Sequence, residues 1–149
     1  MLANIQSQIV QKLEDARQAD VADPPAGLLV PDAVRPYGGE LLQVKRLIGT
    51  VPVIFVEFDV ANLTPANAGG STGQGPITFD VIVASHQQRS VTDEYSDGVA
   101  LLTWAYEALL GMYLIVGDQR AHWSSMTTQR LATTERVWLA KIGVTMEFN

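Results

Sequence analysis

The sequence predicts an α+β fold in which a mixed or antiparallel sheet carries two helices packed on one face. Two segments repeat apolar residues at the three- and four-residue spacing of an amphipathic helix, and others alternate apolar and polar residues as strands do. Along the chain these segments run helix, extended link, two strands, helix, two strands. No internal repeat or shift in composition divides the 149 residues, so we expect a single domain over residues 1–149.

The first helix is predicted near the N-terminus. The apolar residues of its buried face are Leu2, Ile5, Ile9, Leu13 and Ala16. Asp23-Pro24-Pro25 ends it, because proline cannot continue a helix and moves the preceding residue out of the α region. Residues 28–36 contain two prolines and are expected to be extended, and residues 40–48 are expected to form a short helix.

Residues 50–61 and 77–85 are predicted strands, because apolar side chains alternate along both. The residues expected on one face are Ile54, Val56, Phe58 and Val60 in the first strand, and Ile77, Phe79, Val81 and Val83 in the second. Residues 62–76, between them, are rich in glycine and longer than a tight hairpin turn. The two strands can still pair antiparallel, with this loop projecting as an arm.

The second helix is predicted over residues 92–112. Its apolar stripe is Val99, Leu102, Tyr106, Leu109 and Tyr113, widened by Leu101, Ala105 and Leu110. An edge strand is expected near residues 126–133, followed by a long final strand over residues 135–148. The residues that alternate in this last strand are Trp138, Ala140, Ile142, Val144, Met146 and Phe148.

Composition argues against several classes of protein. The net charge is −6, and the ten lysines and arginines are scattered among sixteen acidic residues, which disfavours binding to a phosphate backbone. Cysteine is absent, so disulfides and thiolate metal sites are excluded. No apolar run approaches the ~18 residues that a membrane span needs, and the N-terminus lacks the basic start of a signal peptide. We therefore expect no membrane association.

No motif for catalysis or cofactor binding emerges. Gly70 and Gly75 have the spacing of a nucleotide-binding loop, but Pro76 stands where the lysine belongs, which favours an exposed loop or an arm that orders against a neighbour. His86 and His122 lack metal-ligand spacing, although the fold could bring them together. The carboxylates Asp93, Glu94 and Asp97 are explained by the start of a helix. We expect no catalytic residue, no cofactor and no metal.

The strands Val51-Pro52-Val53-Ile54-Phe55-Val56 and Thr78-Phe79-Asp80-Val81-Ile82-Val83-Ala84, with the two helices and the long closing strand, resemble the small Mu-like phage tail proteins associated with tail terminators. The resemblance covers nearly the whole chain as an order of elements. It implies a six-fold ring of identical subunits that caps the tail tube and joins it to the head. The implied location is the neck region of a virion tail, assembled in the host cytoplasm.

The same resemblance implies contacts with further copies of the chain, with tail tube and possibly sheath proteins, and with neck or connector proteins. DNA would pass an acidic inner rim without specific binding. The candidate contact residues are Gly69, Gly70, Ser71, Thr72, Gly73, Gln74, Pro31, Arg35 and Tyr37. Two alternatives stay open: a head–tail connector or neck protein, and a small-molecule-binding module or hydrolase that uses His86, His122 and nearby carboxylates.

Overall fold

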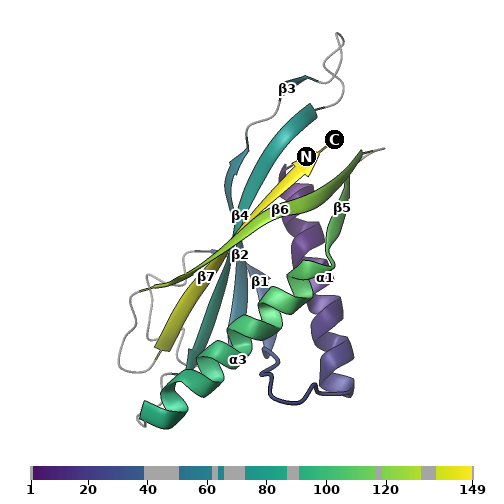
Figure 1. Cartoon of the computed structure of the whole chain (residues 1–149). Coiled ribbons are helices and arrows are strands. Elements are labelled where there is room, and N and C mark those ends of the chain that lie inside the picture. The colour runs from purple at the N-terminus through teal and green to yellow at the C-terminus, as the bar shows by residue number, and fades with distance from the viewer. Residues whose placement is uncertain are drawn as a thin grey trace.

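The structure is a computed structural model that describes residues 2–38, 51–61, 64–65, 73–86, 91–116, 119–131 and 137–148. Its elements are α1 (Leu2–Ala22), β1 (Ala33–Pro36), β2 (Val53–Ala61), β3 (Thr64–Pro65), β4 (Gly73–His86), α3 (Val91–Leu110), β5 (Tyr113–Val116), β6 (Gln119–Arg130) and β7 (Val137–Phe148) (Figure 1). The predicted helix over residues 40–48 lies outside the described residues.

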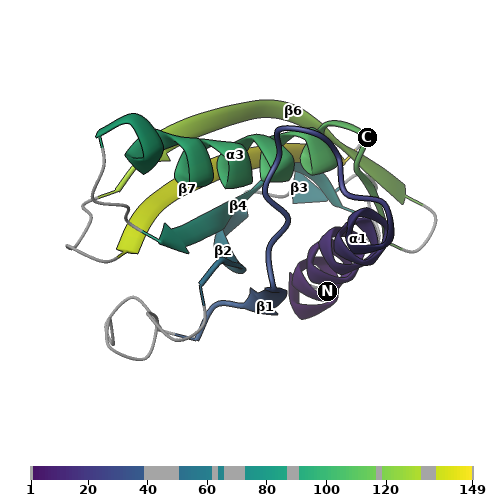
Figure 2. The same cartoon turned by 90° about the horizontal axis from the view of Figure 1, so that it is seen from below.

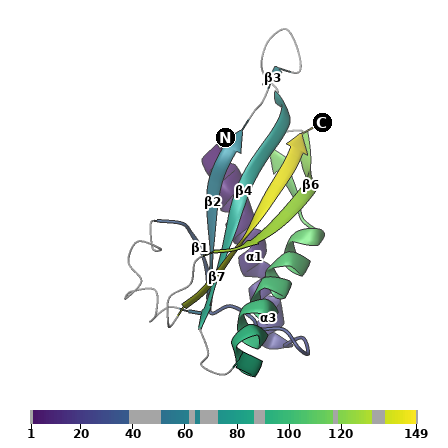
Figure 3. The same ribbon diagram turned by 60° about the vertical axis from the view of Figure 1, so that its left-hand side comes forward.

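Six strands form one curled sheet in the order β1-β2-β4-β7-β6-β5, and β3 pairs with the start of β4. The β1–β2 pair is parallel and all the other pairs are antiparallel, so the sheet is mixed. Figure 3 shows β2, β4, β7 and β6 side by side with α1 behind them. The predicted α+β class is confirmed.

Both helices pack on the same face of this sheet, as predicted. On α1, Ile5, Ile9 and Leu13 are buried in a single cluster with Leu101 and Leu109 of α3. The strand residues of this cluster include Ile54 and Val56 of β2, Ile77, Phe79, Val81 and Val83 of β4, and Trp138, Ala140, Ile142, Val144 and Met146 of β7. The period-two alternation of these three strands therefore placed their buried faces correctly.

The buried face of α3 agrees with the predicted stripe only in part. Leu101, Ala105 and Leu109 are buried as predicted, and Leu102 is partly buried. Val99, Tyr106 and Leu110 are instead 44%, 38% and 39% exposed, and Trp104, which was not predicted, is buried. Gly98 explains why the buried side lies away from Val99. A Cβ atom there would lie 2.5 Å from Cδ2 of Trp138, so only glycine allows α3 to approach the β7 tryptophan so closely. The helix consequently turns its Gly98 side, and not its Val99 side, toward the sheet.

Three strand predictions need correction. Residues 73–76, expected in the loop, belong to β4, where Gly75 pairs with Phe148. The strand expected near residues 126–133 is β6, which begins at Gln119. The sequence prediction missed β5 (Tyr113–Val116), which pairs with the first part of β6. Nearly every described side chain of β6 is exposed, so its sequence shows no alternation of apolar and polar residues that would mark its limits.

The other face of the sheet is apolar at one end and polar at the other. The buried residues at the apolar end are Val51, Val53, Phe55, Ile82, Ala84, Val137 and Leu139. Tyr37 packs edge-on against Phe55, with ring centroids 6.0 Å apart. Toward the other end this face carries Asp80, Lys141 and Thr145 instead.

Candidate assembly surfaces

One edge of the sheet is open along most of β6. The strand pairs with β7 from Ala121 to Arg130, but β5 covers its other side only from Gln119 to His122. Among the described residues, no strand pairs with Trp123–Gln129 on the side away from β7. Unpaired backbone groups in such a row can accept a further strand.

The residue types along this edge also favour pairing with a further strand. The residues from Trp123 to Gln129 are Trp-Ser-Ser-Met-Thr-Thr-Gln, with no charge and no proline. Charged residues, proline and β-bulges are the usual means by which proteins prevent edge-to-edge pairing, and of these the edge has only an irregularity of register between Trp123 and Ser125. By contrast, the part of β2 that β1 leaves uncovered contains Glu57 and Asp59, and β1 itself ends in Pro36.

Large side chains lie next to the open edge. The indole N–H of Trp123 donates a hydrogen bond to the carbonyl oxygen of Leu110 at 2.6 Å, which ties the end of α3 to β6. The polar group of Trp123 is thus already satisfied within the subunit, while its side chain remains 37% exposed. Leu110 and Tyr106, one turn apart on α3, are exposed to a similar degree. We call Trp123–Gln129 with Tyr106 and Leu110 the β6 surface.

Helix α1 covers the β5 edge of the sheet with a glutamine side chain. The Gln8 amide donates to the carbonyl oxygen of Ile115 on β5 at 2.6 Å and accepts from the N–H of the same residue at 3.2 Å. Gln6 makes a different contact: it donates to the carbonyl oxygen of Val56 at 2.8 Å, on the inner strand β2, where the same oxygen also accepts from the Tyr37 N–H. A primary amide offers a donor and an acceptor side by side, so Gln8 satisfies β5 as a neighbouring strand would.

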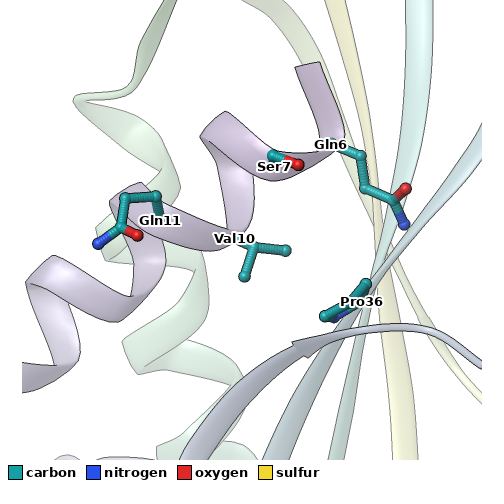
Figure 4. Close-up of a pocket in the computed structure, with 5 residues that line it drawn as sticks. All are labelled: Gln6, Ser7, Val10, Gln11 and Pro36. Carbon is teal, nitrogen blue, oxygen red and sulfur yellow. The ribbon is translucent and has the colours of Figure 1, made fainter. Parts of the chain in front are cut away.

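A small groove opens between α1 and β1. It is lined by Gln6, Ser7, Val10, Gln11 and Pro36 and has a volume of about 270 Å³ (Figure 4). Pockets for small molecules usually hold roughly 300–1,000 Å³ and are lined mainly by apolar side chains. This groove is smaller and has three polar side chains among its five lining residues, so it suits one protruding side chain. We call it the α1 groove.

A polar groove of about 250 Å³ lies on the sheet face away from the helices. Its lining residues are Asp59, Thr78, Asp80, Thr127, Gln129, Lys141, Gly143 and Thr145. Burial raises the pKa of Asp80, partly opposed by the Lys141 ammonium, whose nitrogen lies 3.8 Å from a carboxylate oxygen of Asp80. A carboxyl with a raised pKa can serve acid–base chemistry when a second reactive group faces it. Here the facing groups are the Asp59 carboxylate, which also raises the pKa of Asp80, the Lys141 ammonium, threonine hydroxyls and an amide.

The two histidines do not share a site. His86 pairs with Val137 at the start of β7, and His122 pairs with Glu147 near its end. These partners are ten residues apart along one strand, which separates the histidines by roughly 33 Å. A binding module or hydrolase that needs both histidines is therefore contradicted. Within the described residues, no group of three histidine, aspartate or glutamate side chains could hold a metal ion.

The predicted contact residues fall into three groups. Gly69, Gly70, Ser71 and Thr72 lie outside the described residues. Gly73 and Gln74 belong to β4, where their backbones pair with β3. Of the last group, Pro31 is buried, Tyr37 is half-buried, and Arg35 is exposed on β1 beside the α1 groove. Sequence reasoning missed the β6 surface, although seven consecutive uncharged residues in a polar strand are a signal that could have indicated it.

The chain matches no protein-family model, and no curated protein matches it in sequence. Neither described helix is long and apolar enough to span a membrane.

Proposed function

We propose that the protein is a structural subunit that assembles with copies of itself into a closed ring, as the tail terminator of a phage or phage-derived particle. The observation that carries this proposal is the open, uncharged edge of β6, bordered by Trp123, Tyr106 and Leu110. A subunit that worked alone would expose this edge to uncontrolled pairing. A ring satisfies every such edge and leaves none over.

The ring would cap the tail tube and join it to the neck, with six copies as the family resemblance implies. Its net charge of −6 per chain supports a passage for DNA, because like charges keep the genome from adhering to the inner rim. The projecting hairpin of β3 and the start of β4, which lies beyond the end of β2 in Figure 3, would contact tube or neck proteins. The chain itself would then act by shape and association.

Light scattering and electron microscopy of the purified protein test the proposal, alone and after mixing with tail tubes. We expect a discrete oligomer whose mass is a whole multiple of 16.2 kDa, seen as rings and as caps on tube ends. A protein that stays monomeric at every concentration and never caps tubes would contradict it. A protein that binds only to portal-side components would point to the connector alternative.

A matched pair of variants links assembly to the β6 surface. Ser125→Lys places a charge on the exposed edge, where an incoming strand would have to bury it, so we expect the oligomer to dissociate. Gln18→Lys adds the same charge on the exposed surface of α1, away from both the β6 surface and the α1 groove, and should leave the oligomer intact. Equal effects of the two variants would mean that charge alone, and not the edge, governs assembly.

A further inference from the structure

The sheet has a second open edge besides that of β6. β1 pairs with β2 only as far as Val56, whose carbonyl oxygen accepts from Tyr37 and Gln6. Among the described residues, no strand pairs with Glu57–Ala61 on the side away from β4. In Figure 2, β6 and β1 lie on opposite sides of the molecule, with β7, β4 and β2 between them. Each copy therefore has two different open edges, and a head-to-tail ring needs two different surfaces on each copy.

The two open edges lie at the same level along the strands. A row of directly paired residues crosses the sheet from Glu57 on β2, through Asp80 on β4 and Gly143 on β7, to Thr127 on β6. Copies in a cyclic ring are related by rotation alone, without a shift along the axis. With the ring axis along the strands, rotation brings Glu57 of one copy to the level of Thr127 of its neighbour.

The strand directions agree with such a contact. Three antiparallel pairings separate β2 from β6, so the two strands run in opposite directions within one subunit. Rotation about an axis along the strands preserves these directions, so β6 of one copy meets β2 of the next as an antiparallel pair. The unpaired backbone groups of each edge then gain partners from the other edge.

The lengths of the two edges also match. Trp123–Thr127 extends from the last residue covered by β5 to the level at which β1 of the neighbour begins, and Glu57–Ala61 is the corresponding part of β2. Each edge contains one register irregularity, after Phe58 in β2 and after Trp123 in β6. Since each strand has one extra residue, the two edges still match residue for residue.

In this register the side chains are complementary. Glu57 lies on the sheet face away from the helices, because it pairs with Asp80. On that face β6 presents the Thr127 hydroxyl and the Gln129 amide, and the Lys141 ammonium stands beside Gln129 on β7. The Glu57 carboxylate of one copy would therefore meet hydrogen-bond donors and a cation of the next.

The carboxylates of β2 consequently select a partner for that edge. A β2 edge paired with a second β2 edge would bring Glu57 and Asp59 close to the same residues of the other copy, and like charges across strands are destabilising. The β6 edge is uncharged from Trp123 to Gln129 and does not repel them. Pairing of β6 with β6 would also avoid repulsion, but it would close a dimer and leave the β2 edge open.

We infer that neighbouring copies join by continuing the sheet: Trp123–Thr127 of one subunit pairs antiparallel with Glu57–Ala61 of the next, with Glu57 opposite Thr127. This assignment rests on the proposed ring and adds the two edges that meet in it.

Because the chain contains no cysteine, a pair of introduced cysteines reports this contact without background. In Glu57→Cys/Thr127→Cys, the two thiols of one subunit are three strand spacings apart, roughly 14 Å. A disulfide needs Cα atoms within about 7 Å, so it can form only between subunits, where the two positions lie opposite each other. After mild oxidation we expect a ladder of covalent oligomers that ends at a closed ring, and no ladder from either single variant.

The variant Glu57→Cys/Gln18→Cys is the matched control. It has the same number of thiols, but its second thiol lies on the exposed surface of α1, so it should give no ladder. Circular dichroism of each variant checks that the fold is retained.

A charge exchange tests the register independently. Thr127→Glu sets a carboxylate opposite Glu57, so we expect the concentration at which the oligomer dissociates to rise by about tenfold or more. Adding Glu57→Lys to this variant should restore assembly, whereas Gln18→Glu alone should leave it unchanged. A double variant that assembles no better than Thr127→Glu would overturn the assigned pairing.

The outcomes separate this contact from the ring itself. Dimers of Thr127→Cys alone, without a ladder from the double variant, would overturn the continued sheet in favour of β6–β6 pairing. Rings seen by microscopy without any disulfide would reject the two edges while leaving the proposed function standing. A ladder without closed rings would support the contact and contradict the ring, and a protein that forms neither would overturn both.

Discussion

Replacing Gly98 with alanine tests how α3 is seated on the sheet. A Cβ atom at this position would lie 2.5, 2.7 and 2.9 Å from three atoms of the Trp138 ring, whereas ordinary van der Waals contact begins near 3.4 Å. Trp138 is 3% exposed, so its ring has no solvent space into which it could retreat. The helix or the ring must therefore move by about 1 Å, and such overpacking of a core costs about 1–3 kcal/mol.

The same substitution also has a favourable part, because alanine is better than glycine in a helix by up to about 1 kcal/mol. The clash outweighs this gain, since it involves three ring atoms and a buried neighbour. We expect Gly98→Ala to lower the free energy of unfolding by about 1–2 kcal/mol and the melting temperature by roughly 3–6 °C.

Urea unfolding followed by circular dichroism measures this difference, with Gly111→Ala as the matched control. A Cβ at Gly111 meets nothing within 4 Å, so the free energy of unfolding of that variant should stay within about 0.5 kcal/mol of the wild-type value. In a Trp138→Leu background, the alanine at position 98 should cost less, because the smaller side chain removes the clash. A Gly98→Ala protein as stable as the wild type would refute this account of the helix orientation.

Three further predictions concern hydrogen bonds and charge. Gln8→Ala removes both hydrogen bonds to the β5 backbone, so we expect a loss of about 1–2 kcal/mol in the free energy of unfolding and faster amide exchange of β5; unchanged exchange would disprove the capping. Trp104→Phe keeps an aromatic ring but removes the 2.7 Å indole hydrogen bond to an aspartate of α1, which should cost about 1–3 kcal/mol in urea unfolding. Burial raises the pKa of Asp80, so its contribution to stability is complete below the pKa of the unfolded chain and is lost as pH rises through the folded pKa. Asp80→Asn lacks this loss, and its stability relative to wild type should increase from about pH 3 to about pH 7; a difference that does not change with pH would show that the carboxylate ionises without penalty.

The sequence correctly predicted the elements in which apolar residues recur with one clear period, either that of a helix or that of a strand. Helix α1 and the strands β2, β4 and β7 each bury one face fully, so their apolar spacing repeats without interruption. The orientation of α3 was obtained only in part, because the predicted stripe included the exposed Val99, Tyr106 and Leu110 as well as residues that are buried. That helix has apolar residues on two sides, and the choice between them depends on Gly98 meeting Trp138, which are forty positions apart in the chain.

The candidate surfaces were harder to predict because they depend on how the strands are ordered in the sheet. The strand order decides which strand lies at an edge, and the local sequence of β6 does not indicate that β5 pairs only with its first residues. The α1 groove likewise combines one turn of a helix with Pro36 from a distant strand. The separation of His86 and His122 follows from the register of β4 and β6 on β7, which a single sequence does not contain.

The glutamine contacts of α1 affect the order in which the elements of the chain can fold. Gln6 and Gln8 find their partners 50 and 107 positions further along. Bringing such remote positions together costs conformational entropy of the chain before the contact stabilises the fold. Proteins rich in contacts between distant positions therefore fold slowly. Helix α1 precedes these strands in the chain, so its apolar face can be buried only after the sheet formed by the later strands is complete.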